Sequence, residues 1–210
     1  MTIEEKFDML GIDNAPGQEA LQKHQALDLR GEPLPGPAVD FSHGDVNAHI
    51  PTPGSFEVFE RGVKEGAAQA YTPYRGRKLI LEHVAESLSA FTGAAIDPEK
   101  NLILTPGTQG ALFLAMGSNM MPGDKVAIVE PDYFANRKMV EFFGGELVPI
   151  PMHYEQAEGK AGIDLDALKE AFENGVRLFL FSNPNNPVGC VYSYDEICSI
   201  AAMAREHQVT

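Results

Sequence analysis

The sequence predicts an α/β fold in which helices flank a mostly parallel sheet. From residue 101 onward, apolar runs of strand length alternate with longer segments of helical periodicity, and the connections between them are short. The two clearest strands, 125–129 and 176–181, are rich in Val, Ile, Leu and Phe. With 210 residues, of which 44% are hydrophobic, the chain can bury the core of one domain, or of one domain and a lobe.

The charge and the N-terminal segment argue against several classes of protein. A formal net charge of -14 and a pI of about 4.7 disfavour nucleic acid and anionic membranes as partners, because both attract basic surfaces. Residues 1–6 show no targeting signal, and no apolar run approaches membrane-spanning length, so we expect a cytoplasmic protein. Cys190 and Cys198 are too few for a disulfide scaffold or the usual zinc site, so free thiols and no metal centre are expected.

The first hundred residues predict helices joined by segments rich in glycine and proline. A short helix is expected over 3–10 and an amphipathic one over 56–70. A third helix carries apolar residues at the i, i+3, i+4 and i+7 positions of one face, namely Leu81, Val84, Ala85 and Leu88. It should end at Gly93. Residues 14–37 are interpreted as an arm that needs another surface to pack on, such as a neighbouring subunit, and His43 as a surface or capping residue.

The second half of the chain predicts an alternation of strands and helices. Strands are expected over 102–105, 125–129, 146–150 and 176–181, and helices over 111–116, 136–143, 167–173 and 197–204. Pro149 places its strand near an edge of the sheet, because proline cannot donate to a neighbouring strand. Asp164 or Asp166 caps the third of these helices. Ser193 and Glu196 have the spacing of a capping box, which starts the last helix.

A glycine-containing turn follows the first of these strands. Residues 106–110, Pro-Gly-Thr-Gln-Gly, lead directly into an apolar helix, so backbone N–H groups are left unpaired at the positive end of that helix. Such a terminus binds anions, and the Thr108 hydroxyl adds a donor. The turn has neither the Gly-Lys-Ser/Thr of a Walker A loop nor the three glycines of a dinucleotide site. A phosphate site and a plain tight turn both remain open on this feature alone.

An asparagine-rich loop follows the strand over 176–181. Its residues, from Ser182 to Gly189, are Ser-Asn-Pro-Asn-Asn-Pro-Val-Gly. Two prolines restrict the backbone, three asparagines supply side-chain amides, and the glycine permits a tight exit. Ligands of open α/β sheets collect beyond the carboxyl ends of the strands, so the loop suggests a binding site, although a structural turn fits the loop equally well.

Three strand exits together predict the ligand more closely than any one of them. In chain order they carry the turn at Gly107, Thr108 and Gln109, the aromatic side chain of Tyr133 and the amide of Asn186. The turn can bind a phosphate, the phenol ring can stack on a flat ring, and the amide can donate to a ring oxygen. The set suits a flat, phosphorylated, aromatic cofactor.

From Phe41 to its end, the chain resembles the N-terminal half of class I/II aminotransferases, in the fold-type-I superfamily of enzymes that use pyridoxal 5'-phosphate (PLP). The most specific match is Asn183–Gly189, which is similar to the family pattern Asn-Pro-x-Asn-Pro-Thr-Gly, with Val188 in place of Thr. The resemblance implies a three-layer α/β/α large domain with a mostly parallel sheet, PLP-dependent transferase-like and incomplete at the C-terminus. It assigns 1–45 to an N-terminal arm and small-domain segment, and 46–210 to the N-terminal part of the PLP-binding large domain.

The resemblance also implies roles for individual residues. Asn186 would bind the phenolic oxygen of PLP, Tyr133 would stack on its pyridine ring, and the Gly107–Gln109 turn would bind its phosphate. Tyr71, in the pattern Tyr-x-Pro-x-x-Gly, resembles the tyrosine that reaches the phosphate bound by the partner subunit, which implies a homodimer with its sites at the interface. Gly44 falls where the family has a glycine near the substrate carboxylate.

The reaction implied by the resemblance is transamination between an amino acid and a 2-keto acid. PLP chemistry needs a Schiff-base lysine, and all nine lysines precede the asparagine loop, whereas the family's lysine follows it, beyond a strand that should begin near Val209. We therefore interpret the 210 residues as a portion of an aminotransferase that is inactive alone and binds PLP weakly, without a covalent bond. Alternatives are another fold-type-I enzyme, such as a β-eliminating lyase or a decarboxylase, or a non-catalytic sensor or structural fragment.

Overall fold

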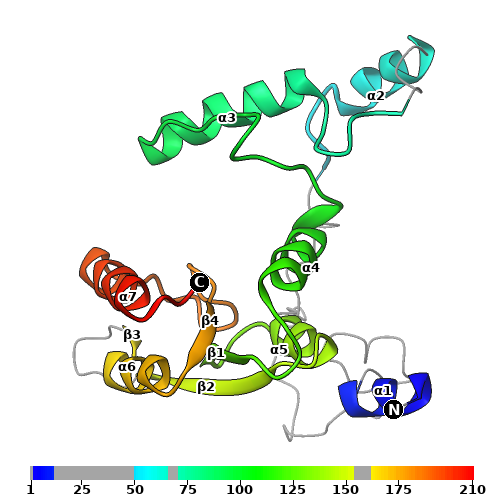
Figure 1. The fold of residues 1–210 in the computed structure, drawn as a ribbon. Coiled ribbons are helices and arrows are strands. Elements are labelled where there is room, and N and C mark those ends of the chain that lie inside the picture. The colour runs from blue at the N-terminus through cyan, green and yellow to red at the C-terminus, as the bar shows by residue number, and fades with distance from the viewer. Residues whose placement is uncertain (1, 12–49, 66–70, 154–161) are drawn as a thin grey trace, which may run out of the picture. The chain divides into compact units, whose positions relative to one another are not determined.

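The structure, a computed structural model, describes residues 2–11, 50–65, 71–153 and 162–210 (Figure 1). The chain divides into two compact units. The sheet unit comprises residues 1–26 and 112–210, and the helical unit comprises residues 27–111. The predicted domain boundary at residue 45 lies outside the described residues.

A four-stranded sheet is the centre of the described part of the sheet unit, with its strands in the order β3-β2-β1-β4. The strands are β1 (Lys125–Glu130), β2 (Glu146–His153), β3 (Gly162–Ile163) and β4 (Val176–Leu180). Strand β1 pairs in parallel with both β2 and β4, and the antiparallel strand is the two-residue β3. The predicted mostly parallel sheet is therefore confirmed.

Pro149 lies in β2, which is the outermost of the parallel strands on one side of the sheet. It is aligned with Ile128 of β1, and β3 pairs with β2 only at Met152 and His153. On the side away from β1, the Pro149 position therefore has no strand partner among the described residues, and the missing N–H is tolerated there. This position agrees with the predicted edge.

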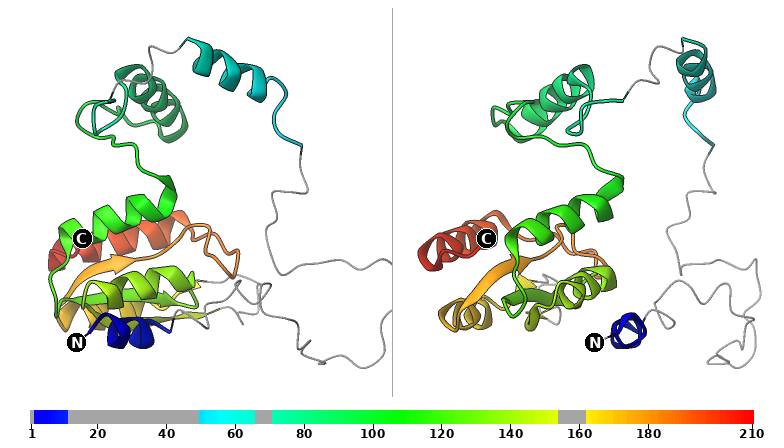
Figure 2. Two further views of the ribbon diagram at one scale, coloured as in Figure 1. Left: turned by 90° about the vertical axis from the view of Figure 1, so that its right-hand side faces the viewer. Right: turned by 45° about the vertical axis from the view of Figure 1, so that its right-hand side comes forward.

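Helices cover both faces of the sheet (Figure 2). The four helices are α4 (Gly107–Asn119), α5 (Phe134–Phe142), α6 (Leu165–Glu173) and α7 (Tyr194–His207). Ala127 and Val129 of β1 pack in one core with residues of α6 and α7. Val126 and Ile128, which point to the opposite face, pack in a second core with residues of α4 and α5. The alternation of side chains along β1 thus produces the predicted three layers.

Local side chains begin several helices where the sequence indicates. At the start of α7, the Ser193 hydroxyl accepts from the Glu196 N–H and the Glu196 carboxylate accepts from the Ser193 N–H, which completes the predicted capping box. At the start of α6, Asp164 Oδ1 accepts from the Ala167 N–H at 2.9 Å, which decides between the two predicted caps. Helix α1 (Ile3–Leu10) covers the predicted range.

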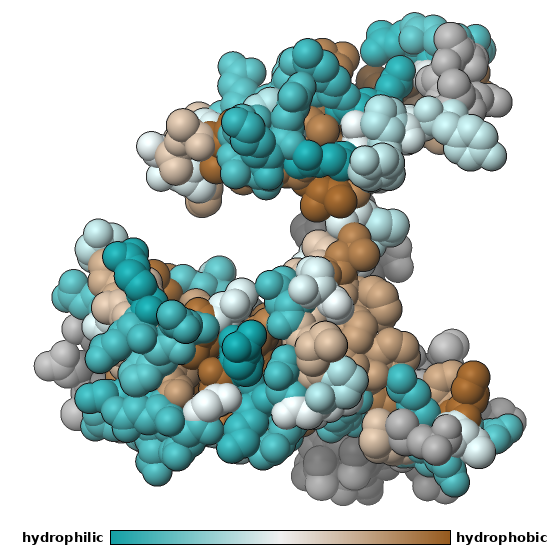
Figure 3. All heavy atoms as spheres, in the orientation of Figure 1, coloured by the Kyte–Doolittle hydropathy of each residue, from teal (hydrophilic) through white to brown (hydrophobic). Residues whose placement is uncertain are grey.

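The helical unit contains α2 (Ser55–Lys64) and α3 (Lys78–Thr92). Helix α3 buries Leu81 and Ala85 and ends at Gly93, whose φ of 71° is left-handed, as predicted. Helix α2 has no buried residue and ends before residue 70, and residues 66–70 lie outside the described part of the chain. Large apolar side chains are exposed on both helices (Figure 3). No helix in the described ranges is long and apolar enough to cross a membrane.

Residues 102–105 do not form the strand predicted for them. They pair with no strand among the residues that the structure describes. Instead, the Leu104 N–H donates to the Arg75 carbonyl at 2.9 Å, and the Arg75 guanidinium donates to the Leu102 carbonyl at 3.0 Å. The prediction was wrong because an apolar run becomes a strand only where a second strand supplies the matching backbone groups, and here Arg75 supplies part of them.

The last residues of the chain enter a strand position, as predicted. After α7, Gln208 adopts a left-handed backbone with φ 56°. The Thr210 N–H then donates to the Arg177 carbonyl at 3.1 Å, and the Thr210 carbonyl accepts from the Phe179 N–H at 2.9 Å. Because this is the hydrogen-bond pattern of parallel strands, Thr210 extends the sheet beside β4.

Candidate functional site

Two predicted site residues follow neighbouring parallel strands of the sheet unit. Tyr133 follows β1, and Asn186 lies in the asparagine loop, residues 182–189, which follows β4. Because β1 and β4 pair in parallel, their carboxyl ends meet at the same edge of the sheet. This edge is where open α/β sheets bind ligands.

A chain of side-chain hydrogen bonds joins these two strand exits. The Ser182 hydroxyl donates to Asp132 Oδ1 at 3.0 Å and accepts from the Asn186 backbone N–H at 3.1 Å. The other Asp132 oxygen, Oδ2, accepts from the Asn136 side-chain amide at 2.8 Å. Asn136 lies in the first turn of α5 and is buried. We call these contacts the bridging chain, because they connect α5 to the asparagine loop.

Asn185 attaches the middle of the loop to its surroundings. It is 2% exposed, and its amide nitrogen donates to the Pro131 carbonyl at 3.2 Å and to the Tyr192 hydroxyl at 3.3 Å. Its side-chain oxygen accepts from the Val188 N–H at 3.1 Å. Since a buried amide that makes three hydrogen bonds is held in one orientation, Asn185 has a structural role in the loop.

Tyr192 packs against the asparagine loop and makes hydrogen bonds with two of its asparagines. Its backbone N–H donates to the Asn183 side-chain oxygen at 3.3 Å, and its ring packs edge-on against Phe181 with the centroids 5.8 Å apart. Burial raises the pKa of the Tyr192 phenol to about 12, and the hydrogen bond from Asn185 opposes part of that effect. The phenol is therefore neutral at physiological pH, and its oxygen accepts a hydrogen bond from the Asn185 side-chain amide.

The side chains of Asn186 and Tyr133 are left available by this arrangement. The Asn186 side chain is exposed and makes no hydrogen bond with any residue that the structure describes. Tyr133 is half-buried, and its ring lies against Phe134 at a centroid distance of 4.8 Å. An amide donor and an aromatic face are thus presented from adjacent, cross-linked loops, which suits a flat ligand with a polar oxygen.

The predicted anion-binding turn lies in the helical unit, at the start of α4. Gly107 has a left-handed φ of 72°, and a Cβ added there would meet no atom within 4 Å. The Thr105 hydroxyl donates to the Gly107 carbonyl at 2.9 Å, which helps to shape the turn. Gly107, Thr108 and Gln109 are exposed at the first turn of a 13-residue helix, where backbone N–H groups have no carbonyl partner within the helix. The Gly107 N–H donates to the Thr105 carbonyl at 2.8 Å, so the N–H groups of Thr108 and Gln109 are the ones left for a ligand. These residues suit an anion.

The remaining predicted contacts are separate from the two cross-linked loops. Tyr71 lies in the helical unit, and its side chain is fully exposed. Gly44 lies outside the described residues. The structure therefore places Tyr133 and Asn186 on two loops of one unit that hydrogen bonds join, and the other predicted contacts remain individual predictions.

Sequence reasoning did not identify the residues that connect the loops. Asp132, Ser182, Asn185 and Tyr192 carry the cross-links, and none was assigned a role. A signal for the first two was present, because a polar residue with a short side chain follows each strand exit within two positions of the strand end. Their mutual contact still required the pairing of β1 with β4, which the sequence does not specify.

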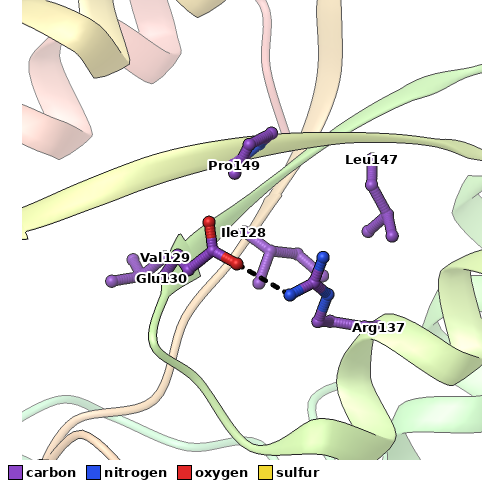
Figure 4. A pocket seen from close by; sticks show the side chains of 6 residues that line it. All are labelled: Ile128, Val129, Glu130, Arg137, Leu147 and Pro149. Carbon is purple, nitrogen blue, oxygen red and sulfur yellow. Dashed lines mark hydrogen bonds and ion pairs between the residues drawn. The ribbon is translucent and has the colours of Figure 1, made fainter.

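Neither of two cavities in the described part of the sheet unit is lined by Tyr133 or by residues 182–189. One is lined by Ile128, Val129, Glu130, Arg137, Leu147 and Pro149 (Figure 4). Its volume of about 10 Å³ holds a single water molecule at most, and Arg137 and Glu130 form an ion pair of 2.8 Å at its edge. The other, of about 280 Å³, is an open groove beside α6 at the beginnings of β1 and β4, where Lys125 and Val176 lie. No group of three His, Cys, Asp or Glu that could bind a metal occurs among the described residues.

Comparisons with known proteins agree on one family. Residues 47–210 match the family described as aminotransferase class I and II. A crystal structure of an aspartate aminotransferase from Rhodobacter sphaeroides 2.4.1 is 56% identical, with a TM-score of 0.83 over 100% of this chain and 50% of that chain. Kynurenine–oxoglutarate transaminase 1 from Mus musculus is 30% identical over 95% of this chain and 46% of its own length. An aspartate aminotransferase from Musicola paradisiaca is 29% identical over 81% of this chain and 42% of its own. The chain spans about half the length of the relatives it matches.

Proposed function

Because the chain belongs to the class I and II aminotransferase family, we propose that it forms part of a PLP-dependent aminotransferase. The reaction moves an amino group between an amino acid and a 2-keto acid. The family match, which covers residues 47–210, supports this reaction class. The observation that carries the proposal is the pair of cross-linked loops. Their hydrogen bonds leave the side-chain amide of Asn186 without a partner in the described part of the chain, and the neighbouring strand exit carries Tyr133.

The residues present fit PLP in chemical type. Asn186 offers an amide donor for the phenolic oxygen, and Tyr133 offers an aromatic face for the pyridine ring. Thr108 and Gln109 offer N–H groups at the first turn of α4 and Thr108 adds a hydroxyl for the phosphate, whereas the Gly107 N–H donates to the Thr105 carbonyl at 2.8 Å. When bound, PLP supplies an electron sink that weakens the bonds at the α-carbon of an amino acid. The residues of this chain would bind and orient the group from which that chemistry follows.

The lysines of this chain support the view that the Schiff-base lysine is not among them. Lys23 and Lys160 lie outside the described residues. The other lysines each contact a group that is outside the two strand exits, through ion pairs, a carbonyl or an aromatic ring: Lys6 with Phe142, Lys64 with Glu60, Lys78 with Glu82, Lys100 with Asp97, Lys125 with Asn174, Lys138 with Glu141 and Lys169 with Glu173. Proton transfer at the α-carbon is therefore not assigned to any of these seven lysines.

Several finer features belong to the same proposal. Tyr71 contacts the phosphate bound by the partner subunit, which makes the protein a homodimer. Its side chain is fully exposed within the helical unit, as a residue that reaches another subunit should be. Gly44 lies near the substrate carboxylate, and residues 46–210 are the N-terminal part of the PLP-binding large domain. The acidic composition and the family are in keeping with a cytoplasmic enzyme.

The test is PLP binding by the full-length protein with Asn186→Ala, followed by absorbance titration. Loss of one hydrogen bond to the cofactor should weaken PLP binding about tenfold and slow amino transfer. Asn174→Ala is the matched control, since Asn174 is an exposed asparagine at the end of α6. Unchanged PLP affinity and unchanged amino transfer in Asn186→Ala would remove the assigned role, and a wild-type protein that takes up no PLP would overturn the function.

A further inference from the structure

We propose that Ser182 and Asp132 are positioning residues, which hold Asn186 in place through the bridging chain. The inference rests on the proposed function, because Asn186 is the residue expected to bind PLP. It concerns two side chains that would not touch the cofactor themselves. Their role would be to set the backbone of the residue that does.

In the bridging chain, the chemistry of the side chains decides which group donates and which accepts in each hydrogen bond. A carboxylate can only accept hydrogen bonds, so the Ser182 hydroxyl must be the donor in its bond to Asp132 Oδ1. The Ser182 oxygen is then free to accept, and it accepts from the Asn186 N–H at 3.1 Å. The order of the bonds is therefore determined by Asp132, and the acceptor offered to Asn186 is a consequence of it.

The far end of the bridging chain is anchored in the core of the sheet unit. Asn136 is 4% exposed and lies in α5, one turn before Val140, which is fully buried. Its amide holds Asp132 Oδ2 at 2.8 Å. Since Tyr133 lies between Asp132 and Asn136 in the sequence, the same anchor also fixes the backbone that carries the aromatic ring.

The bridging chain has a different task from Asn185. Asn185 binds Pro131, Tyr192 and Val188 and so holds the loop as a whole. The bond to Ser182 is the one that reaches the Asn186 backbone. Removing the Ser182 hydroxyl should therefore leave the loop folded and release only the segment that presents the Asn186 amide.

Two substitutions should preserve the positioning. Ser182→Thr keeps a hydroxyl that can donate and accept. Asp132→Asn keeps an oxygen for Ser182, and its new amide can donate to Asn136 Oδ1, which is buried and has no partner among the described residues. That contact requires the Asn136 amide to turn over, which exchanges its nitrogen and oxygen without moving other atoms.

The test uses the full-length protein with Ser182→Ala, Ser182→Thr, Asp132→Asn and Asn186→Ala, and with the double variant Ser182→Ala/Asn186→Ala. We expect Ser182→Ala to weaken PLP binding about fivefold to tenfold, and the two conservative variants to stay within about twofold of wild type. If Ser182 acts through Asn186, the double variant should bind PLP as Asn186→Ala does, because the side chain being positioned is already absent. Ser199→Ala is the control, since that hydroxyl donates to Asp195 within its own helix.

A second measurement does not depend on PLP. Hydrogen exchange is measured on the peptide that contains residues 182–189. At the Asn186 backbone N–H it should be about tenfold faster in Ser182→Ala, and unchanged in Ser182→Thr and Ser199→Ala. Wild-type exchange in Ser182→Ala, or effects of the two alanine substitutions on PLP binding that multiply, would overturn the inference. A wild-type protein that binds no PLP overturns the proposed function instead, and the exchange result then still decides whether Ser182 holds Asn186.

Discussion

Asn186 and the Gly107–Gln109 turn are predicted to contact the same cofactor, yet the chain holds them by different means. Around Asn186, buried or half-buried side chains from two strand exits form a continuous set of hydrogen bonds. The turn is exposed and is shaped by a left-handed glycine and by one hydroxyl from Thr105. One region is built by tertiary contacts and the other by local backbone conformation.

The difference follows from what each segment lacks. Pro184 and Pro187 have no N–H, so the asparagine loop cannot be held by a regular backbone ladder, and side-chain amides take over that role. The turn leads straight into a helix, whose own backbone bonds fix everything after its first residues. Substitutions in the loop should therefore act through distant partners, and substitutions in the turn through backbone strain.

The largest effect is expected from Asn185→Ala in the full-length protein. Pro131, Tyr192 and Val188 each lose a hydrogen-bond partner, so the free energy of unfolding should fall by about 3 kcal/mol. The adjacent Asn186→Ala should change it by less than about 0.5 kcal/mol, since that side chain is exposed. Urea unfolding measures both. Equal losses of unfolding free energy in the two variants would contradict the view that Asn185 holds the loop and that the Asn186 side chain is free for a ligand.

The next effect is expected from Gly76→Ala in the helical unit. Gly76 has a φ of 118°, and a Cβ there would lie 2.6 Å from Leu104 Cδ1, so the Leu104 side chain must shift. We expect a loss of about 2 kcal/mol in unfolding free energy. Gly107→Ala is the matched control, because it has only the cost of left-handed backbone, about 1 kcal/mol, and no clash. A larger loss at Gly107 would show that tertiary contacts hold the turn as well.

A smaller effect, dependent on pH, is expected from Tyr192→Phe. The folded pKa of about 12 lies above the ordinary value of 10.0, so between these pH values the unfolded state releases a proton that the folded state keeps. Stability of the wild type should therefore fall as pH rises from 10 to 12. The variant should lose about 1 kcal/mol at neutral pH and lack this part of the alkaline fall.

Urea unfolding at several alkaline pH values tests that expectation, with Tyr74→Phe as the control because Tyr74 is exposed. If Tyr192→Phe and wild type decline in parallel above pH 10, the phenol is not the group that titrates, and the loop is less buried than the structure shows.

The smallest effect is expected from Lys64→Ala in α2. Lys64 Nζ lies 2.8 Å from Glu60 Oε1, but both side chains are exposed. Such pairs contribute about 0.5 kcal/mol or less, and the loss should shrink further in high salt. Thermal unfolding at two salt concentrations measures it, with Glu60→Gln as the reciprocal change. A loss above 1 kcal/mol would mean that ion pairs, rather than backbone conformation, stabilise the helical unit.

The elements that the sequence predicted well are those with short-range causes. The caps at Ser193 and Asp164 and the helix end at Gly93 depend on residues within a few positions of one another. The strand predicted over 102–105 failed for the opposite reason, because a strand exists only with a partner, and its backbone groups bind Arg75. The bridging chain was missed because Ser182 and Asp132 are 50 positions apart.

By itself, the sequence determined most of the strands and helices, the caps, and a loop in which three asparagines follow a buried strand, and the resemblance to aminotransferases singled out Asn186 among them. Only the tertiary structure decided how the other two are used. Asn183 and Asn185 have the same side chain as Asn186, but the folded chain places Tyr192 beside the first and Pro131 beside the second. Identical amides acquire different roles because burial and hydrogen-bond partners, which are set by distant residues, determine what each one can do.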